Sequence, residues 1–398
     1  MKRIAIIGAG ASGLCAAIEA KNADPNIEIT IFERMQKSGK KILATGNGRC
    51  NFTNDDLSLI HFYGNKEFLK TILSSQFSDT KDFFRRLGVL PYEEDGRIYP
   101  RSQQASTIKE ALLKAVESRN ITIKTECHIS NIQKTKNGFS VNGEGFDRVI
   151  IAGGGKAAAV HGSDGSCYKL AESLGHKLTP LYPALCGLVI NDKDLNLLKG
   201  VRAECNAELY SGTTLLGSES GEIQFTDKAI SGIPVMNLSH LCENRRDLKI
   251  HLDLCPEFDW KELFNHLKQS TSASPSVEFE AALNGIVNLK LGFAVMNRSG
   301  IKPQTKCGSL KDFQIKEVVN QLKGFEISIR SAKGFDSAQV TKGGIKTNEV
   351  SPTTMMSEKA AGLFLCGEIL DIHGDCGGYN LHLAFTTGRI AGYNAAKF

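Results

Sequence analysis

The residues with the clearest chemical potential are three glycines and one glutamate near the start of the chain. Gly8, Gly10 and Gly13 have the spacing G-x-G-x-x-G, and Glu33 follows 20 residues after the last of them. Glycines at this spacing let the backbone turn tightly and approach a pyrophosphate, and an acid about 20 residues later can accept hydrogen bonds from a ribose diol. Together they predict a site for a dinucleotide.

The segments around these residues are the ones that such a site needs. The apolar residues 4–7 predict a buried strand, residues 12–22 a helix, and residues 27–32 a second strand. A helix that starts at the glycines points the positive end of its dipole at the phosphates. The order strand, glycines, helix, strand and acid favours a dinucleotide site over a glycine turn in an unrelated α/β domain.

A second glycine-rich stretch, residues 37–54, has the sequence KSGKKILATGNGRCNFTN. Gly46 and Gly48 give the backbone freedom to wrap a ligand, and Lys40, Lys41 and Arg49 add positive charge. We expect this stretch to run beside the first loop along a cofactor with two phosphates. The alternative is a basic surface loop that only connects two elements.

The end of the chain is again rich in glycine. Residues 363–366 predict a buried strand, 367–379 a loop, and 380–396 a helix with the small residues Ala384, Gly388 and Gly392 on one packing face. The start of this helix, at residues 379–381, would aim backbone N–H groups at an electron-rich ligand atom. A last strand and helix that return to the first domain make that domain discontinuous.

The hydrophobic pattern in the middle of the chain differs from the strand–helix pattern at its two ends. Residues 189–256 hold short alternating segments, including 213–216 and 222–225, which indicate a small barrel or sandwich, and residues 259–323 are helical. We therefore expect a dinucleotide-binding domain at 1–188 and 336–398, an inserted small barrel or sandwich at 189–256 and 324–335, and a helical insert at 257–323. Residues 147–155 predict a strand that ends in glycines. Gly153 and Gly155 formally fit a second fingerprint, so a separate nicotinamide domain is the alternative to a turn that closes the first domain.

Composition limits the classes of function. The 398 residues are 41% hydrophobic and 23% charged, with a net charge of +5, which is typical of a globular protein of two or three domains. This charge gives no independent support for nucleic acid or an anionic membrane as partner. Eleven irregularly spaced cysteines without a C-x-x-C pair indicate free thiols, and they argue against a redox-active vicinal disulfide or a zinc knuckle. We expect no metal site.

The chain also lacks the signals for export or membrane insertion. Met1 leads directly into the first predicted strand, which leaves no room for a signal peptide. No apolar stretch approaches the ~20 residues that span a bilayer. Together with the free thiols, these observations predict a cytoplasmic protein.

Five segments in order resemble one known family: IAIIGAGASGL, GKKILATGNGRCNFTN, IIAGGGKAA with GSDGSCYKLAESLGH, TKGGIKTNEVSPTTMMS, and GLFLCGEILDIHGDCGGYNLHLAFTTGRIAG. They are similar to the BaiN/RdsA-like flavoproteins, also described as aminoacetone-oxidase-family FAD-binding enzymes. The resemblance implies a two-dinucleotide-binding-domain flavoprotein fold around FAD, with an inserted β-barrel that carries a small helical subdomain. The chain departs from the family's middle motif, because Asp227 occupies a position where the family often has histidine and Ile233 separates Gly232 from Pro234.

The resemblance also implies a set of cofactor contacts. The pyrophosphate and ribose contacts would be Gly8, Ala9, Gly10, Ala11, Ser12, Gly13, Glu33 and Arg34. Contacts along the cofactor and at adenine would be Lys41, Gly46, Gly48, Arg49, Cys50, Asn51, Ile129, Ala152, Gly153 and Gly154. Contacts to the ribityl chain and the isoalloxazine ring would be Gly367, Glu368, Asp371, Gly377, Gly378, Asn380 and Leu381.

The catalytic residues are less defined by sequence. His373, Tyr379 and Arg49 are the weak candidates for acid–base chemistry near the ring, although a single histidine or tyrosine more often has a structural role. The basic neighbourhood of Cys50 offers a lowered thiol pKa as one possibility and a buried, inert thiol as the favoured one.

Three functions stay open at this point. The first is an FAD oxidoreductase that takes hydride from NAD(P)H and reduces a small unsaturated or carbonyl-conjugated substrate. The second is an amine oxidase that acts on an aminoacetone-like substrate and passes electrons to oxygen. The third is a tRNA-modifying or structural flavoprotein, which the small net charge disfavours.

Overall fold

The computed structural model describes residues 2–398. Its contacts divide the chain into two compact units, the first formed by residues up to Tyr182 with Ala338–Phe398, and the second by Pro183–Ser337. The chain passes between them at β12 (Tyr182–Ala184). The fold class predicted from the sequence is confirmed, because a Rossmann-like domain is interrupted by a closed barrel and helices. The finer three-part division stays a prediction.

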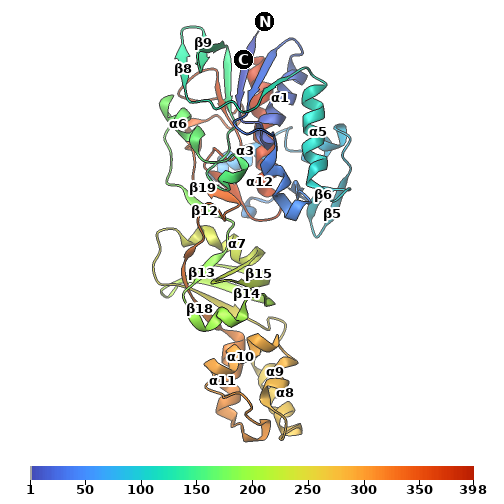
Figure 1. Ribbon diagram of the computed structural model, residues 1–398, viewed down its shortest axis with the longest axis vertical. Helices are drawn as coiled ribbons and strands as arrows, with labels where there is room; N and C mark the ends of the chain where they lie inside the picture. The colour runs from blue at the N-terminus through green and yellow to red at the C-terminus, as the bar shows by residue number, and fades with distance from the viewer. Residues whose placement is uncertain (1) are drawn as a thin grey trace. The chain divides into compact units, whose positions relative to one another are not determined.

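The first unit is built on a parallel sheet with the strand order β20-β11-β1-β2-β7. Both ends of the chain lie in this unit (Figure 1). In chain order the strands are β1 (Arg3–Ile7), β2 (Glu28–Phe32), β7 (Thr122–Lys124), β11 (Arg148–Ile151) and β20 (Leu363–Leu365). The sequence spacing of β11 and β20 means that the sheet is completed only by the end of the chain. Parallel strands are covered on both faces, which explains the continuous burial of residues 4–7.

Smaller antiparallel sheets and helices surround the parallel sheet. The additional strands are β3 (Thr53–Asn54), β4 (Phe62–Gly64), β5 (Pro91–Glu94), β6 (Arg97–Pro100), β8 (Ile132–Thr135), β9 (Gly138–Val141), β10 (Glu144–Phe146), β19 (Val340–Lys342) and β21 (Ile372–Gly374). The helices are α1 (Ala11–Ala23), α2 (Lys40–Leu43), α3 (Lys66–Leu73), α4 (Thr80–Arg86), α5 (Ala105–Glu117), α6 (Ser166–Ser173) and α12 (Tyr379–Lys397).

The first and last helices of the first unit pack closely together. A Cβ atom added at Gly392 of α12 would lie 2.0 Å from the carbonyl oxygen of Ala16 in α1. One added at Gly388 would lie 2.3 Å from the carbonyl oxygen of Ser12. The predicted packing face of small residues is therefore confirmed at both glycines, and it brings the two ends of the chain together.

The second unit contains a closed barrel with the strand order β13-β16-β15-β14-β17-β18. The strands are β13 (Leu188–Ile190), β14 (Arg202–Ser211), β15 (Thr214–Thr226), β16 (Ala229–Gly232), β17 (Leu248–Asp253) and β18 (Phe325–Ala332). Residues alternate between buried and half-buried along β17, as expected for a barrel wall. Of the two architectures expected for this region, barrel or sandwich, the barrel is the one observed.

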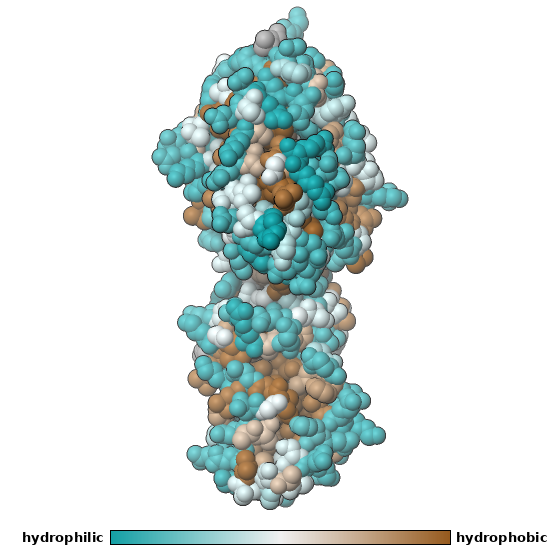
Figure 2. Space-filling model, turned by 90° about the vertical axis from the view of Figure 1, so that its right-hand side faces the viewer, coloured by the Kyte–Doolittle hydropathy of each residue, from teal (hydrophilic) through white to brown (hydrophobic). Residues whose placement is uncertain are grey.

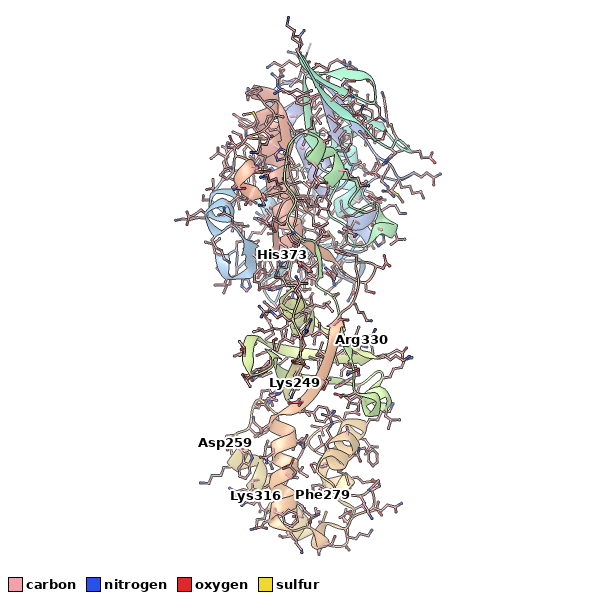
Figure 3. All side chains as sticks on the ribbon, turned by 90° about the vertical axis from the view of Figure 1, so that its left-hand side faces the viewer. Lys249, Asp259, Phe279, Lys316, Arg330 and His373 are labelled. Atoms are coloured by element: carbon pink, nitrogen blue, oxygen red, sulfur yellow. The ribbon has the colours of Figure 1, made fainter. Side chains whose placement is uncertain are left out.

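Five helices complete the second unit: α7 (Ile233–Leu238), α8 (Trp260–Ala273), α9 (Phe279–Asn284), α10 (Leu289–Arg298) and α11 (Asp312–Lys323). Asp259 begins α8 with a capping box to Glu262, and the fully buried Phe279 lies among the helices (Figure 3). Exposed apolar side chains also occur here, among them Phe293 and Phe313, and hydrophobic patches are visible on one face of this unit (Figure 2).

Several predicted element boundaries were wrong. The segments 213–216 and 222–225 belong to one long strand, β15, because the cross-strand pairing with β14 continues through the polar residues between them. The 37–54 stretch, which was expected to be a loop, contains the short helix α2. Within residues 2–398, no helix combines the length and apolar character needed to cross a membrane.

Candidate functional site

The first glycine loop lies between β1 and α1 and is held by backbone hydrogen bonds. The N–H of Gly8 donates to the carbonyl of Phe32 at 2.8 Å, and the N–H of Gly39 donates to the carbonyl of Ala9 at 2.9 Å. A Cβ atom at Gly13 would lie 2.0 Å from the oxygen of Gly8, so this position requires glycine. The loop therefore fixes the start of α1 directly at the end of β1.

The start of α1 is open. Gly10 precedes the helix and supplies no side-chain cap, and a Cβ atom added at Gly10 would meet nothing within 4 Å. The first N–H groups of a helix lack intrahelical partners and carry partial positive charge. Ala11 and Ser12 occupy this first turn. The empty space over Gly10 is the cradle that a pyrophosphate needs.

Glu33 lies beside the glycine loop, at the end of β2. Its Oε2 accepts the N–H of Ala9 at 2.9 Å, and its Oε1 accepts the N–H of Met35 at 2.8 Å. The carboxylate is buried and held at the loop, where a ribose next to the phosphates would be. Arg34 forms an ion pair with Asp164. Against the effect of burial, hydrogen bonds from Ser166 and the Arg34 charge lower the pKa of Asp164 to about 2.

The second glycine stretch is tied to the loop that follows β20. Lys41 Nζ forms an ion pair with Glu368 Oε2 at 2.7 Å and donates to the carbonyl of Ala157. Glu368 Oε1 accepts the N–H of Thr341 at 2.9 Å. These contacts join residues from four separate parts of the sequence. Gly46 and Gly48 both have positive φ, at 55° and 83°.

Arg49 is bound by neighbouring side chains, and Cys50 is buried in the core. Arg49 donates to Glu94 at 2.7 Å and to the Tyr99 hydroxyl at 3.2 Å, and its guanidinium lies over the Tyr99 ring. Cys50 is fully buried, and this burial raises its pKa to about 12. The alternative of a reactive, low-pKa thiol at Cys50 was therefore wrong, because the loss of solvation outweighs the hydrogen bond with Thr45, which lowers the pKa.

Asn51 meets the glycine pair that precedes α12. Asn51 is 8% exposed, and within the described chain its Oδ1 is buried without a hydrogen-bond partner. A Cβ at Gly378 would lie 2.7 Å from this oxygen and 2.4 Å from the carbonyl oxygen of Thr53. Asn54 Nδ2 donates to the carbonyl of Gly377 at 2.9 Å. The 51–54 segment therefore contacts the C-terminal glycine pair directly.

The start of α12 is organised by side chains. Asn380 Oδ1 accepts the N–H of Gly374 at 2.9 Å, and its Nδ2 donates to the carbonyls of Gly374 and Asp375. Gly378 has φ of 97°, a conformation that favours glycine. In the same region, the N–H of Gly367 donates to Thr387 at 2.9 Å, while Asp371 and Leu381 lie in the 367–381 segment.

The expected cofactor residues after β11 border the first glycine loop, because a Cβ atom added at Gly8 would lie 2.7 Å from the carbonyl oxygen of Ala152. Ala152, Gly153 and Gly154 follow β11, next to β1 in the sheet. A Cβ at Gly153 would lie 2.1 Å from Cys167 Sγ, so this turn also passes close to its neighbour. Ile129 is buried and lies in the segment that follows β7.

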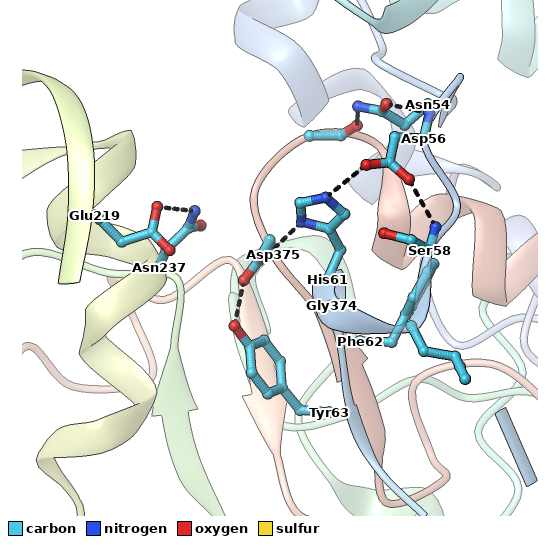
Figure 4. Close-up of polar contacts among 12 residues, drawn as sticks. Asn54, Asp56, Ser58, His61, Phe62, Tyr63, Glu219, Asn237, Gly374 and Asp375 are labelled. Atoms are coloured by element: carbon cyan, nitrogen blue, oxygen red, sulfur yellow. Dashed lines mark hydrogen bonds and ion pairs between the residues drawn. The ribbon is translucent and has the colours of Figure 1, made fainter. Parts of the chain in front are cut away.

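A polar network that the sequence did not predict surrounds Asp375, in the loop that precedes α12 (Figure 4). His61 Nδ1 and Asp375 Oδ2 are 3.0 Å apart, and His61 Nε2 and Asp56 Oδ2 are 3.2 Å apart. The Tyr63 hydroxyl donates to Asp375 Oδ1 at 2.8 Å. Both oxygens of the buried Asp375 are therefore occupied. No motif surrounds His61; the pairing of β4 with β21 and the hydrogen bond from the N–H of Asp375 to the carbonyl of His61 bring these residues together.

The other two weak catalytic candidates are packed against rings. His373 is buried in β21 and stacks on Tyr63, with ring centres 5.1 Å apart. Tyr379 stacks on His61 at 4.7 Å, and burial raises its pKa to about 12. A tyrosine with a raised pKa holds its proton at neutral pH. Within residues 2–398, no cluster of three or more His, Cys, Asp or Glu side chains is placed to hold a metal ion.

The residues present fit FAD on two observations. The space over Gly10 at the first helix start accommodates the pyrophosphate, because no side chain fills it. The unpartnered Asn51 Oδ1 at the second helix start can accept a hydrogen bond from a ring N–H. The open helix start and the unsatisfied acceptor lie on segments that the two ends of the chain bring together.

Comparisons with known proteins agree with this arrangement. The sequence model described as HI0933-like protein Rossmann domain matches residues 2–394. The chain is 37% identical over its full length, and over the full length of the relative, to 3-dehydro-bile acid delta(4,6)-reductase of Clostridium scindens. It is 28% identical to ribosomal RNA dihydrouridine synthase of Haemophilus influenzae, covering 96% of this chain and 95% of that protein.

A solved structure supports the same fold. The 3-ketosteroid delta1-dehydrogenase of Sterolibacterium denitrificans has a TM-score of 0.54 and 12% sequence identity, with both chains covered completely. This likeness concerns the fold alone. The family match and the reductase relative, together with the fit of the site, lead to one assignment. The chain belongs to the HI0933-like protein family, and it is an FAD-dependent oxidoreductase.

Proposed function

We propose that the protein accepts a hydride from NADH or NADPH at N5 of FAD and uses it to reduce a small organic substrate whose double bond is conjugated to a carbonyl group. The main support is the relative that is 37% identical over both full lengths, whose name describes a bile acid delta(4,6)-reductase. We also propose that the reaction takes place in the cytoplasm, since all eleven cysteines are free.

The residues predicted from sequence have distinct roles in this proposal. FAD supplies the redox chemistry when bound, and the protein supplies binding, orientation and electrostatics. The loop Gly8–Gly13 binds the pyrophosphate with backbone N–H groups, and Glu33 binds the ribose. Lys41 and Glu368 hold the segments along the cofactor together.

The ring side of the site depends on α12 and the 51–54 segment. The N-terminus of α12 would stabilise negative charge that develops on a reduced flavin ring bound beside it. Asn51 accepts a hydrogen bond from the ring, and Asn380 holds the Gly374–Asp375 turn in place. The single observation that carries this arrangement is the unpartnered Asn51 Oδ1 beside the glycine pair that starts α12.

Anaerobic stopped-flow reduction tests the first step. The purified yellow protein is mixed with NADH or NADPH, and flavin absorbance is followed; at least one nucleotide should bleach it. The reduced protein is then mixed with a 3-oxo-4-ene bile acid, which should restore the oxidised spectrum and yield the reduced acid. A flavin that neither nucleotide bleaches overturns the proposal. Peroxide release with aminoacetone in air would instead support the amine oxidase.

Reduction of a uridine in RNA is the second candidate. It is favoured by the relative whose name describes a ribosomal RNA dihydrouridine synthase. It predicts that cells lacking the protein lose a dihydrouridine from ribosomal RNA, which mass spectrometry of RNA digests detects. It also predicts salt-sensitive retention of RNA by the protein. An unchanged dihydrouridine content argues against this candidate.

A further inference from the structure

One arginine near the start of α12 has no protein partner, although its neighbours in the sheet do. Arg97 on β6 is directly opposite Glu94 on β5 and Asn54 on β3. Residues directly opposite one another in antiparallel strands project to the same face. Glu94 is occupied by Arg49 at 2.7 Å, and Asn54 is occupied by the carbonyl of Gly377. The Arg97 guanidinium forms no hydrogen bond or ion pair with any residue of the described chain.

Burial distinguishes Arg97 from the other arginines whose side chains lack a hydrogen-bond or ion-pair partner. Arg97 is half-buried. The arginines that also lack a hydrogen-bond or ion-pair partner among residues 2–398 are all exposed, namely Arg85, Arg101, Arg245, Arg246 and Arg330. An exposed guanidinium is solvated by water, whereas a half-buried one loses part of that solvation without compensation. A half-buried, unpaired guanidinium is therefore suited to an external anion.

The charge of Arg97 reaches the loop before α12. Burial raises the pKa of the Cys376 thiol and of the Tyr379 hydroxyl, and the Arg97 charge opposes both shifts. The N-terminus of α12 adds partial positive charge at the same place. The two carboxylates nearby do not compete for Arg97, because Asp375 is bound by His61 and Tyr63, and Asp56 by His61.

We propose that Arg97 binds a carboxylate group of the substrate, so that the enzyme selects monoanionic organic acids. The proposal rests on the proposed reduction and names the substrate class for that site. One guanidinium presents two parallel N–H donors, which match the two oxygens of a carboxylate. A single unpaired cation also balances the charge of a monoanion and leaves a phosphate dianion undercompensated. Arg97 would thus fix the acid while the reacting part of the molecule lies at the ring.

Calorimetric binding to the oxidised holoenzyme tests this without turnover. The probes are a saturated 3-oxo bile acid and its methyl ester, which differ only in the negative charge. We expect the acid to bind about tenfold more tightly than the ester, the usual scale for a charged hydrogen-bonded pair. Arg97→Gln should remove this preference by weakening acid binding about tenfold and leaving the ester unchanged. Arg97→Lys should retain part of it.

The control is Arg101→Gln, which removes a positive charge just after β6 but from an exposed arginine that lies over the Tyr92 ring. It should leave both affinities unchanged. FAD absorbance confirms that each variant is folded and loaded. Equal binding of acid and ester by the unmodified protein overturns the proposal, as does an equal loss of both in Arg97→Gln. Weaker FAD binding in Arg97→Gln, with acid preference intact, would mean that Arg97 contacts the cofactor.

Two further outcomes separate this proposal from others. Tighter binding of uridine 5′-monophosphate than of the bile acid, lost in Arg97→Gln, would overturn the carboxylate assignment in favour of a phosphate. Arg97-dependent acid binding without any reduction of the unsaturated acid would support the binding site and overturn the proposed reaction. Reduction of acid and ester with equal KM would overturn the binding site and leave the reaction intact.

Discussion

The two glycine-rich helix starts of the first unit are built in different ways. The start of α1 has open space over Gly10 and is held by backbone hydrogen bonds between neighbouring segments. The start of α12 is held by the side chains of Asn54 and Asn380, and Asn54 is 323 residues away from its partner Gly377. The proposed phosphate site is thus held by the backbone of neighbouring segments, whereas the proposed ring side is held by side chains from distant parts of the chain.

The largest effect is expected from a substitution at Gly13 that disrupts the start of α1. Gly13→Ala places a Cβ atom 2.0 Å from the carbonyl oxygen of Gly8, so β1 and α1 must separate. We expect unfolding stability to fall by about 3 kcal/mol and FAD to be lost. Urea unfolding and flavin absorbance measure both. The control is Gly285→Ala, where the new atom would meet only an oxygen at 3.6 Å. An unchanged urea midpoint for Gly13→Ala contradicts the close approach.

Acid should weaken the second helix start before the first. His382 of α12 is fully buried, with Nδ1 2.9 Å from the Thr53 hydroxyl, and burial followed by the Arg389 charge lowers its pKa to about 4. In the unfolded chain His382 takes up a proton near its ordinary pKa of 6.5, whereas the folded protein holds the ring neutral down to about pH 4. The free energy of unfolding is therefore highest above pH 6.5. It decreases as the pH falls toward 4.

From pH 7 to pH 5, His382 should therefore lower the free energy of unfolding by about 2 kcal/mol. Urea unfolding at both values measures this change. His382→Gln cannot take up the proton, so its stability should depend less steeply on pH by the same amount. Equal pH dependence in the two proteins would show that His382 is not held neutral.

A smaller effect is expected from Asn380→Asp. The amide Nδ2 donates to the carbonyls of Gly374 at 2.7 Å and Asp375 at 3.2 Å, and a carboxylate cannot donate. The added negative charge also opposes reduction of a ring placed at this helix start. We expect FAD affinity to fall about tenfold, or the flavin reduction potential to fall. Asn394→Asp, at the other end of α12, should change neither. A titration without either change contradicts the placement of the ring.

The smallest effect on stability is expected at Gly10, where a substitution separates the requirements of FAD binding from those of folding. Gly10→Ala adds an atom that meets nothing within 4 Å, at a backbone φ of −88° that alanine adopts. The stability of the protein should stay within about 0.5 kcal/mol of the original. FAD affinity should nevertheless fall about tenfold or more, because the added methyl group occupies the phosphate cradle. Unchanged FAD binding would place the pyrophosphate elsewhere.

This contrast also explains what could be predicted from the sequence. The β1–α1–β2 unit, the glycine loop and the packing glycines of α12 were predictable, because short-range spacing determines them. The pairing of His61 with Asp375, 314 residues apart, was not, because it depends on how β4 meets β21. Arg97 was also missed, because its significance lies in the partners that its neighbours have taken.

The interlocking of α1 with α12 has a consequence for synthesis on the ribosome. The sheet lacks β20, and α1 lacks its packing partner, until translation reaches the C-terminus. The roughly 216 residues after Tyr182 take on the order of 10 to 40 seconds to translate. During that interval the barrel-containing unit can complete itself, while the nascent N-terminal region carries uncovered apolar surface. Chaperone occupancy on the nascent chain should therefore persist until the final residues emerge.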